Sequence, residues 1–267
     1  MYIQIKEITP KALVCFEGAL KIFLLLNGDN HPAVATSYSY IGQIYFAQND
    51  YSKALDYFKK SLNLDLSFFG ENHPEVASGY YNIGYVYFAQ GDYSKALEYF
   101  EEVLKIRLSV YGENHSRVAS VYNDIGEIYS VQGDDFKALD YFKKSLKIVL
   151  SVYGENHSQV SSIYDHIGEV YFAQKDYSKA LYYFEESLKI RLSLFGENHP
   201  EVALSYYSIG SLYIIQGDKS KALNYYEKSL KIRLSVYGEN HPLTKEIMDL
   251  INVAANSKVL QSPETTK

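Results

Sequence analysis

The sequence predicts an all-α fold, an α-solenoid of stacked antiparallel helix pairs, on three observations. Six histidines lie 42 residues apart, at His31, His73, His115, His157, His199 and His241. Apolar residues within each repeat follow the three-and-four spacing of a helix, and polar, glycine-containing turns separate the apolar runs. A repeat of this length is typical of arrays in which each unit buries its apolar face only against its neighbours.

The second full repeat shows how each helix pair is expected to form. Pro74 opens the first helix, because proline is preset for the first helical turn, and one apolar stripe runs from Val76 to Phe88. Gly91 ends this helix, since glycine suits the left-handed end of a helix. A second helix follows with apolar residues from Ala96 to Leu108. Each repeat is therefore predicted to be a helical hairpin with short polar connections.

The same interpretation divides the whole chain. Residues 1–30 hold a partial first repeat, whose second helix is Thr9–Leu26, and a turn. Residues 31–240 hold five full helix pairs, which begin near Pro32, Pro74, Ser116, Ser158 and Pro200. A capping helix, Pro242–Ala255, lies in residues 241–256, and residues 257–267 are expected to be a disordered tail. Two alternatives stay open for Met1–Ile8: an irregular cap, or the start of a fragment of a longer protein.

Small residues recur inside the helices and indicate close packing. Glycine inside a helix costs about 1 kcal/mol relative to alanine. Its presence in five successive first helices predicts an approach too close for a Cβ atom, at Gly42, Gly84, Gly126, Gly168 and Gly210. The complementary small residues of the second helices are Ala54, Ala96, Ala138, Ala180 and Ala222.

Composition narrows the class of protein. With 47% apolar residues the 267-residue chain has ample material for a core, and its net charge of −6 argues against nucleic acid as a partner. The apolar stretch from residue 12 to 26 is interrupted by Glu17 and Lys21, so we expect neither a targeting segment nor a membrane span. We therefore expect a cytoplasmic protein. Its only cysteine, Cys15, is expected to be a packed thiol, since it occupies the place of Tyr57 in the repeat.

No residues in the sequence form a pattern typical of catalysis. Equivalent histidines in adjacent repeats are at least about 8–10 Å apart, too far to share one metal ion. Each is expected instead to cap the helix that follows it. We find no phosphate-binding glycine loop and no nucleophile–base arrangement, so we expect neither an enzyme nor a cofactor or metal site.

The repeat resembles a known family. Tyr80, Ile83-Gly84, Tyr87, Ala96 and Phe100 match the pattern of the tetratricopeptide repeat, with tyrosine in the position of its tryptophan. The eight additional residues per repeat are similar to the 42-residue variant found in kinesin light chains. This resemblance implies a right-handed superhelix and a non-catalytic scaffold that binds a peptide or protein in a concave groove lined by the first helices.

The groove positions follow from helical geometry, as the face of each first helix opposite its buried stripe. The predicted binding residues are Tyr81, Asn82, Tyr85, Asn123, Asp124, Glu127, Asp165, His166, Glu169 and Tyr207. The complete set of groove positions contains no lysine or arginine, is aromatic toward the N-terminus, acidic in the middle and apolar toward the C-terminus. It thus lacks the cations that chaperone-binding and kinesin-light-chain grooves use, and we expect a basic or basic-aromatic partner.

Several alternatives remain open. The acidic residues of the groove either bind a partner or only solvate a surface, and His166 either makes binding pH-sensitive or is a satisfied surface histidine. The chain is either a general scaffold, a cargo adaptor of the kinesin-light-chain kind, or the partner-binding part of a larger signalling protein. Self-association through apolar surface at Leu13, Phe16 and Leu20 is a further alternative. The sequence does not identify the partner, the pathway or the oligomeric state.

Overall fold

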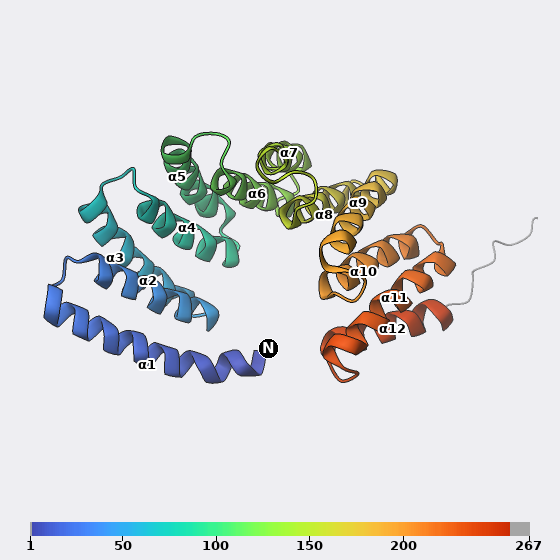
Figure 1. The fold of residues 1–267 in the computed structure, drawn as a ribbon, viewed down its shortest axis with the longest axis horizontal. Helices are drawn as coiled ribbons and strands as arrows, with labels where there is room; N and C mark the ends of the chain where they lie inside the picture. Colours follow the sequence, from blue (N-terminus) through green and yellow to red (C-terminus); the bar gives the residue numbers. More distant parts are fainter. Residues whose placement is uncertain (1, 257–267) are drawn as a thin grey trace, which may run out of the picture. The chain divides into compact units, whose positions relative to one another are not determined.

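The computed structural model describes residues 2–256, and this part of the chain is built of helices joined by short turns (Figure 1). In chain order the helices are α1 (Tyr2–Asn27), α2 (Pro32–Ala47), α3 (Tyr51–Phe69), α4 (Pro74–Ala89), α5 (Tyr93–Tyr111), α6 (Ser116–Val131), α7 (Asp135–Tyr153), α8 (Ser158–Ala173), α9 (Tyr177–Phe195), α10 (Pro200–Ile215), α11 (Lys219–Tyr237) and α12 (Pro242–Asn256). The predicted starts of the five first helices are confirmed. None of the described helices is long and apolar enough to cross a membrane.

The chain divides into two compact units, residues 1–148 and 149–267. In the first unit α1 packs on α2, and this sequential packing continues through α3, α4 and α5 to α6. In the second unit the same order runs from α8 through α9, α10 and α11 to α12. The predicted stacking of helix pairs is therefore confirmed within each unit.

The repeating histidines begin the first helices, as expected. In each of the six turns the imidazole Nδ1 accepts a hydrogen bond from the backbone N–H two residues later, for example His115 from Arg117 at 3.1 Å. Five of the rings also stack on the aromatic residue four positions earlier, as His73 does on Phe69 at 4.1 Å between ring centroids. The imidazoles thus satisfy N–H groups that the helix itself leaves unpaired.

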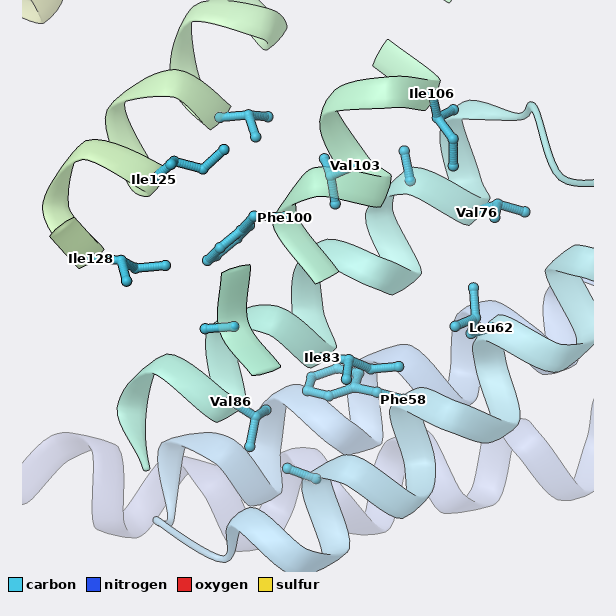
Figure 2. Packing of buried hydrophobic residues seen from close by; sticks show 14 residues of the cluster. Phe58, Leu62, Val76, Ile83, Val86, Phe100, Val103, Ile106, Ile125 and Ile128 are labelled. Carbon is cyan, nitrogen blue, oxygen red and sulfur yellow. The ribbon is translucent and has the colours of Figure 1, made fainter. Parts of the chain in front are cut away.

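The core of each unit consists of the facing apolar stripes of its helices. In the first unit Phe58, Ile83, Phe100 and Ile125 come from four successive helices and share one buried cluster (Figure 2). An equivalent cluster in the second unit surrounds residues such as Ile209. Because the stripe on each helix is satisfied by its two neighbours, the opposite face of each first helix is left free for other contacts.

The predicted close contact inside each pair is confirmed, and its partner is an aromatic ring. A Cβ added to Gly126 would lie 2.7 Å from the ring of Phe142, and Gly42, Gly168 and Gly210 face equivalent rings at the same distance. Gly84 differs, since its nearest atom would be the Cβ of Tyr99 at 3.1 Å. The five paired alanines are completely buried, as expected.

The N-terminal part of the chain departs from the predictions. Helix α1 begins at Tyr2 rather than Thr9, so residues 2–8 are regular helix. Of the two alternatives for this segment, the irregular cap is therefore wrong for the described residues. Cys15 is exposed, which corrects its prediction as a packed thiol. The equivalent Tyr57 packs against Tyr38 and Tyr45 of the preceding helix, whereas no described helix precedes α1.

The apolar surface of α1 also differs from the expectation. Leu13, Phe16 and Leu20 are half-buried, and Phe16 stacks on Tyr40 at 4.8 Å, because these residues face α2. From residue 11 onward, the large apolar residues that α1 leaves exposed are Val14, Ile22, Leu25 and Leu26. The predicted disordered tail, residues 257–267, lies outside the described residues.

Candidate functional site: the outer face of the first helices

The predicted groove residues of the first unit lie on neighbouring first helices and contact one another. Asn82 of α4 donates a hydrogen bond from Nδ2 to the Ser39 hydroxyl of α2 at 3.4 Å. The ring of Tyr85 lies 5.6 Å from that of Phe46, also between α4 and α2. Tyr81 of α4 hydrogen-bonds Asp124 of α6. The structure therefore brings these predicted positions together along one face.

A pocket of about 520 Å³ opens on this face between α2 and α4. Its size falls within the range of about 300–1,000 Å³ typical of ligand pockets. The first helices contribute Pro32, Thr36, Ser39, Tyr40, Gln43, Glu75, Ser78, Gly79, Tyr81 and Asn82, and the second helices contribute Ser61, Asp65, Phe69 and Arg107. Two predicted binding residues, Tyr81 and Asn82, thus line a concave, polar and aromatic site.

The middle of the first unit is less acidic than its sequence suggests. Burial, and then the nearby Glu127, raise the pKa of Asp124 to about 7, so this carboxyl carries only part of its charge at neutral pH. Burial also raises the pKa of Glu127, whose carboxylate accepts a hydrogen bond from Asn123 at 2.7 Å. The pKa of Tyr81 is raised by burial and by the charge of Asp124, which keeps its phenol protonated.

Arg107, on the second helix α5, supplies a positive charge that the sequence analysis did not expect here. Its guanidinium lies 5.3 Å from the centre of the Tyr81 ring. It donates hydrogen bonds to the Arg117 carbonyl at 2.8 Å and to the Ser120 hydroxyl at 3.0 Å. The first-helix positions themselves hold no lysine or arginine, but this arginine of a second helix lines the same pocket.

In the second unit a buried arginine pairs with a predicted acidic residue. Arg191 of α9 places Nη2 2.7 Å from Asp165 and 3.1 Å from Glu201, while Nη1 donates to the Ser205 hydroxyl at 2.8 Å. Burial raises the pKa of Asp165 even so, and the adjacent arginine opposes that shift.

The other predicted residues of the second unit have different surroundings. His166 is half-buried, and burial lowers its pKa against the opposing effect of Glu169, so its imidazole is neutral at pH 7. Glu169 is exposed. The Tyr207 hydroxyl donates to Glu246 of α12 at 3.2 Å, and the guanidinium of Arg233 lies 5.0 Å from the centre of its ring.

The sequence of the first helices alone does not predict these arginines, because they belong to the second helices. The signal was present, since one position of the second helix holds Asp65, Arg107, Val149, Arg191 and Arg233 at intervals of 42 residues. Helical geometry turns this position toward the gap between consecutive first helices. Among the described residues no group of histidine, cysteine and acidic side chains could hold a metal ion.

Comparison with known proteins identifies the repeat and the fold. A model of the tetratricopeptide repeat matches residues 9–67, 61–109, 75–149, 117–193 and 159–235. Comparison with curated proteins gives no match.

Solved structures give similar folds at low sequence identity. BtubC (BKLC) from P. vanneervenii has a TM-score of 0.74 and 21% identity, over 88% of this chain and 94% of that one. TPR-like repeats of kinesin-light-chain type from Podosopora anserina have a TM-score of 0.65 and 16% identity, over 78% of this chain and 98% of theirs. The Rap conjugation gene regulator of the plasmid pLS20, in complex with the Phr* peptide, has a TM-score of 0.66 and 16% identity, over 85% of this chain and 60% of that one.

Proposed function

Since the chain belongs to the tetratricopeptide repeat family, we propose that it is a non-catalytic scaffold that binds a peptide segment of a partner protein. The peptide binds in a groove lined by the first helices, on the face opposite their buried apolar stripe. One observation carries this proposal: the pocket between α2 and α4 is lined by polar and aromatic residues from the positions that the sequence analysis assigned to a groove. Concave sites with a few polar groups are the usual places of ligand binding.

We further propose that the partner segment is basic or basic-aromatic. Tyr40 and Tyr85 expose 44% and 43% of their surface on this face, which suits stacking by aromatic or cationic side chains. Arg107 and Arg191 reduce the negative charge around Asp124 and Asp165. Glu169 and the pocket residue Glu75 are exposed, and Glu127 is half-buried.

Selection from a displayed library of random peptides tests this function. We expect the full chain to enrich peptides that combine arginine or lysine with an aromatic residue. Reversing two charges of the face, with Glu127→Lys and Glu169→Lys, should weaken the binding of the enriched peptides. The matched control reverses two exposed charges on second helices, with Glu98→Lys and Glu185→Lys, and should bind as the unmodified chain does.

Two results would contradict the proposal. One is the absence of any enriched peptide that binds the purified chain. The other is equal loss of binding in the groove variant and the control variant, which would indicate a nonspecific effect of net charge. We also propose a cytoplasmic location, which imaging of a fluorescent fusion would test.

A further inference from the structure

The second-helix position that carries Arg107, Arg191 and Arg233 carries Asp65 in the first full repeat. In three of the other four repeats the guanidinium fills a slot between two consecutive first helices, and the third full repeat has Val149 at this position. The structure therefore contains three examples of how this repeat binds an arginine side chain, and an acidic slot at Asp65 that lacks it.

The three arginines use the same small set of positions. Arg107 contacts Tyr81, the carbonyl of Arg117 and Ser120. Arg191 contacts Asp165, Glu201 and Ser205. Arg233 contacts Tyr207, the carbonyl of Leu243 and Glu246, the last at 3.5 Å.

These partners map to four residues of the first full repeat. Each residue that contacts one of the arginines has an equivalent at the slot of Asp65, found by moving back along the chain in steps of 42 residues. These equivalents are Ser39, Glu75, Ser78 and Gly79. All four residues line the 520 Å³ pocket, together with Asp65. Ser39 and Gly79 are smaller than their counterparts in the later repeats, and Asp65 is shorter than arginine. Space is therefore left that the arginine fills in three of the other repeats.

The charge of this pocket is negative at its base. Asp65 is only 8% exposed, and the charged group that acts most on it is Glu75, which is also an acid. Glu75 and Ser78 occupy the first turn of α4 and present a carboxylate, a carbonyl and a hydroxyl, the groups that accept guanidinium hydrogen bonds in the other slots. Arg107 lines the other side of the pocket but is held by Arg117 and Ser120 of α6.

We propose that the pocket between α2 and α4 binds the guanidinium of an arginine side chain from a partner peptide, which takes the place that Arg107, Arg191 and Arg233 have in three other repeats. This inference rests on the proposed function and specifies the residue that is recognised. The planar guanidinium donates in a fixed fork to carboxylate oxygens, which an ammonium group does not reproduce. Tyr40 at the rim adds an aromatic face for the residue next to the arginine.

A titration of the ¹⁵N-labelled full chain with Nα-acetyl-arginine methylamide, followed by NMR, tests the site without a known partner. We expect shifts at the amides of Thr36, Gly79 and Asn82. The equivalent citrulline compound has the same shape without the charge, and should bind at least tenfold more weakly. Equal binding of citrulline, equal binding of the lysine compound, or no shifts at millimolar concentration would overturn the proposal.

Three variants test which groups hold the ligand. Asp65→Asn and Glu75→Gln should each weaken arginine binding at least tenfold, and Asp65→Arg should abolish it by filling the slot. The control Glu98→Gln removes an exposed charge on α5 and should leave binding unchanged. If Asp65→Asn does not fold, Glu75→Gln still gives the readout, because the Glu75 side chain is exposed. Unchanged binding in folded Glu75→Gln and Asp65→Arg would overturn the assignment.

The peptides selected above separate this inference from the proposed function. Replacement of their arginines by citrulline should reduce binding to the unmodified chain at least tenfold. Peptides that bind equally well after this replacement would leave the scaffold function standing and overturn the arginine site. If no peptide is selected, the scaffold function fails, while the capped arginine still reports on the pocket.

Discussion

Replacement of Arg191 by leucine tests whether the buried arginines hold the outer face together. The side chain of Arg191 is 5% exposed and pairs with two carboxylates. Asp165 is 18% exposed and so has little access to water, whereas Glu201 is 46% exposed and can be hydrated when the arginine is removed. Most of the cost should therefore come from Asp165, which would be left charged and unpaired.

The expected loss of stability in Arg191→Leu follows from the difference in burial between Asp165 and Glu201. Removing one partner of a buried ion pair costs about 3–5 kcal/mol, and the lost hydrogen bond to Ser205 is part of that sum. The same change at Arg233 should cost less, about 1.5–3 kcal/mol for a hydrogen bond to a charged group, because its carboxylate partner Glu246 is 47% exposed. Arg233→Leu is thus a matched control for the buried carboxylate.

The stability lost in Arg191→Leu should depend on pH. Burial already raises the pKa of Asp165 above its unfolded value, and removal of Arg191 raises it further. Between the unfolded pKa of about 3.9 and the raised folded pKa, only the folded chain keeps the proton, so stability falls as pH rises. Arg191→Leu should therefore lose more at pH near 7.5 than at pH near 5, and adding Asp165→Asn should restore most of the loss.

Urea unfolding measures the change in the free energy of unfolding. Because repeat arrays unfold with limited cooperativity, hydrogen exchange of the amides in α8 to α10 measures the part of this change that is local to Arg191. A loss under about 1 kcal/mol at pH 7.5 would contradict the 3–5 kcal/mol expected for an uncompensated buried carboxylate. A double variant as unstable as Arg191→Leu alone would contradict the role given to Asp165.

Four further predictions concern stability and use thermal or urea unfolding. Gly126→Leu should cost about 1–3 kcal/mol or more, because the new side chain meets the Phe142 ring at 2.7 Å, and an unchanged melting temperature would remove the close-contact argument. Lys175→Gly should stabilise by about 1 kcal/mol, since Lys175 has a φ of 63°, and a loss of stability would show that this strain is absent. His115→Ala should cost about 1 kcal/mol through the lost helix cap, whereas His115→Asn should retain most of it; equal losses would count against capping. Burial raises the pKa of Asp65 to about 6, so the chain should lose stability as pH rises from about 4 to 6. Asp65→Asn should remove this pH dependence and raise the free energy of unfolding by up to about 3 kcal/mol at pH 7.5. A variant whose stability depends on pH as that of the unmodified chain does would argue against a buried carboxyl.

The sequence by itself determined the helix pairs, the starts of the five first helices and the pairwise stacking, but not the start of α1. Proline at Pro74 and the capping His73 act on the backbone of their own turn, and the apolar stripe of each helix follows from its period. The small Gly126 predicted a close approach, although the sequence did not say that the neighbour is the Phe142 ring. These features depend on residues that lie near one another in the chain or repeat without change.

Only the tertiary structure decided the electrostatics of the candidate site. The charge on Asp165 depends on Arg191, 26 residues away on another helix. The space in the pocket depends on Asp65, in a position that three other repeats fill with arginine. The charges of the first helices alone therefore do not predict the charge of this face. Burial and a partner from a different helix set both the pKa of its carboxyl groups and the space open to a ligand. The periodic sequence specified where each side chain sits in its helix, and packing between helices specified which charges remain available to a ligand.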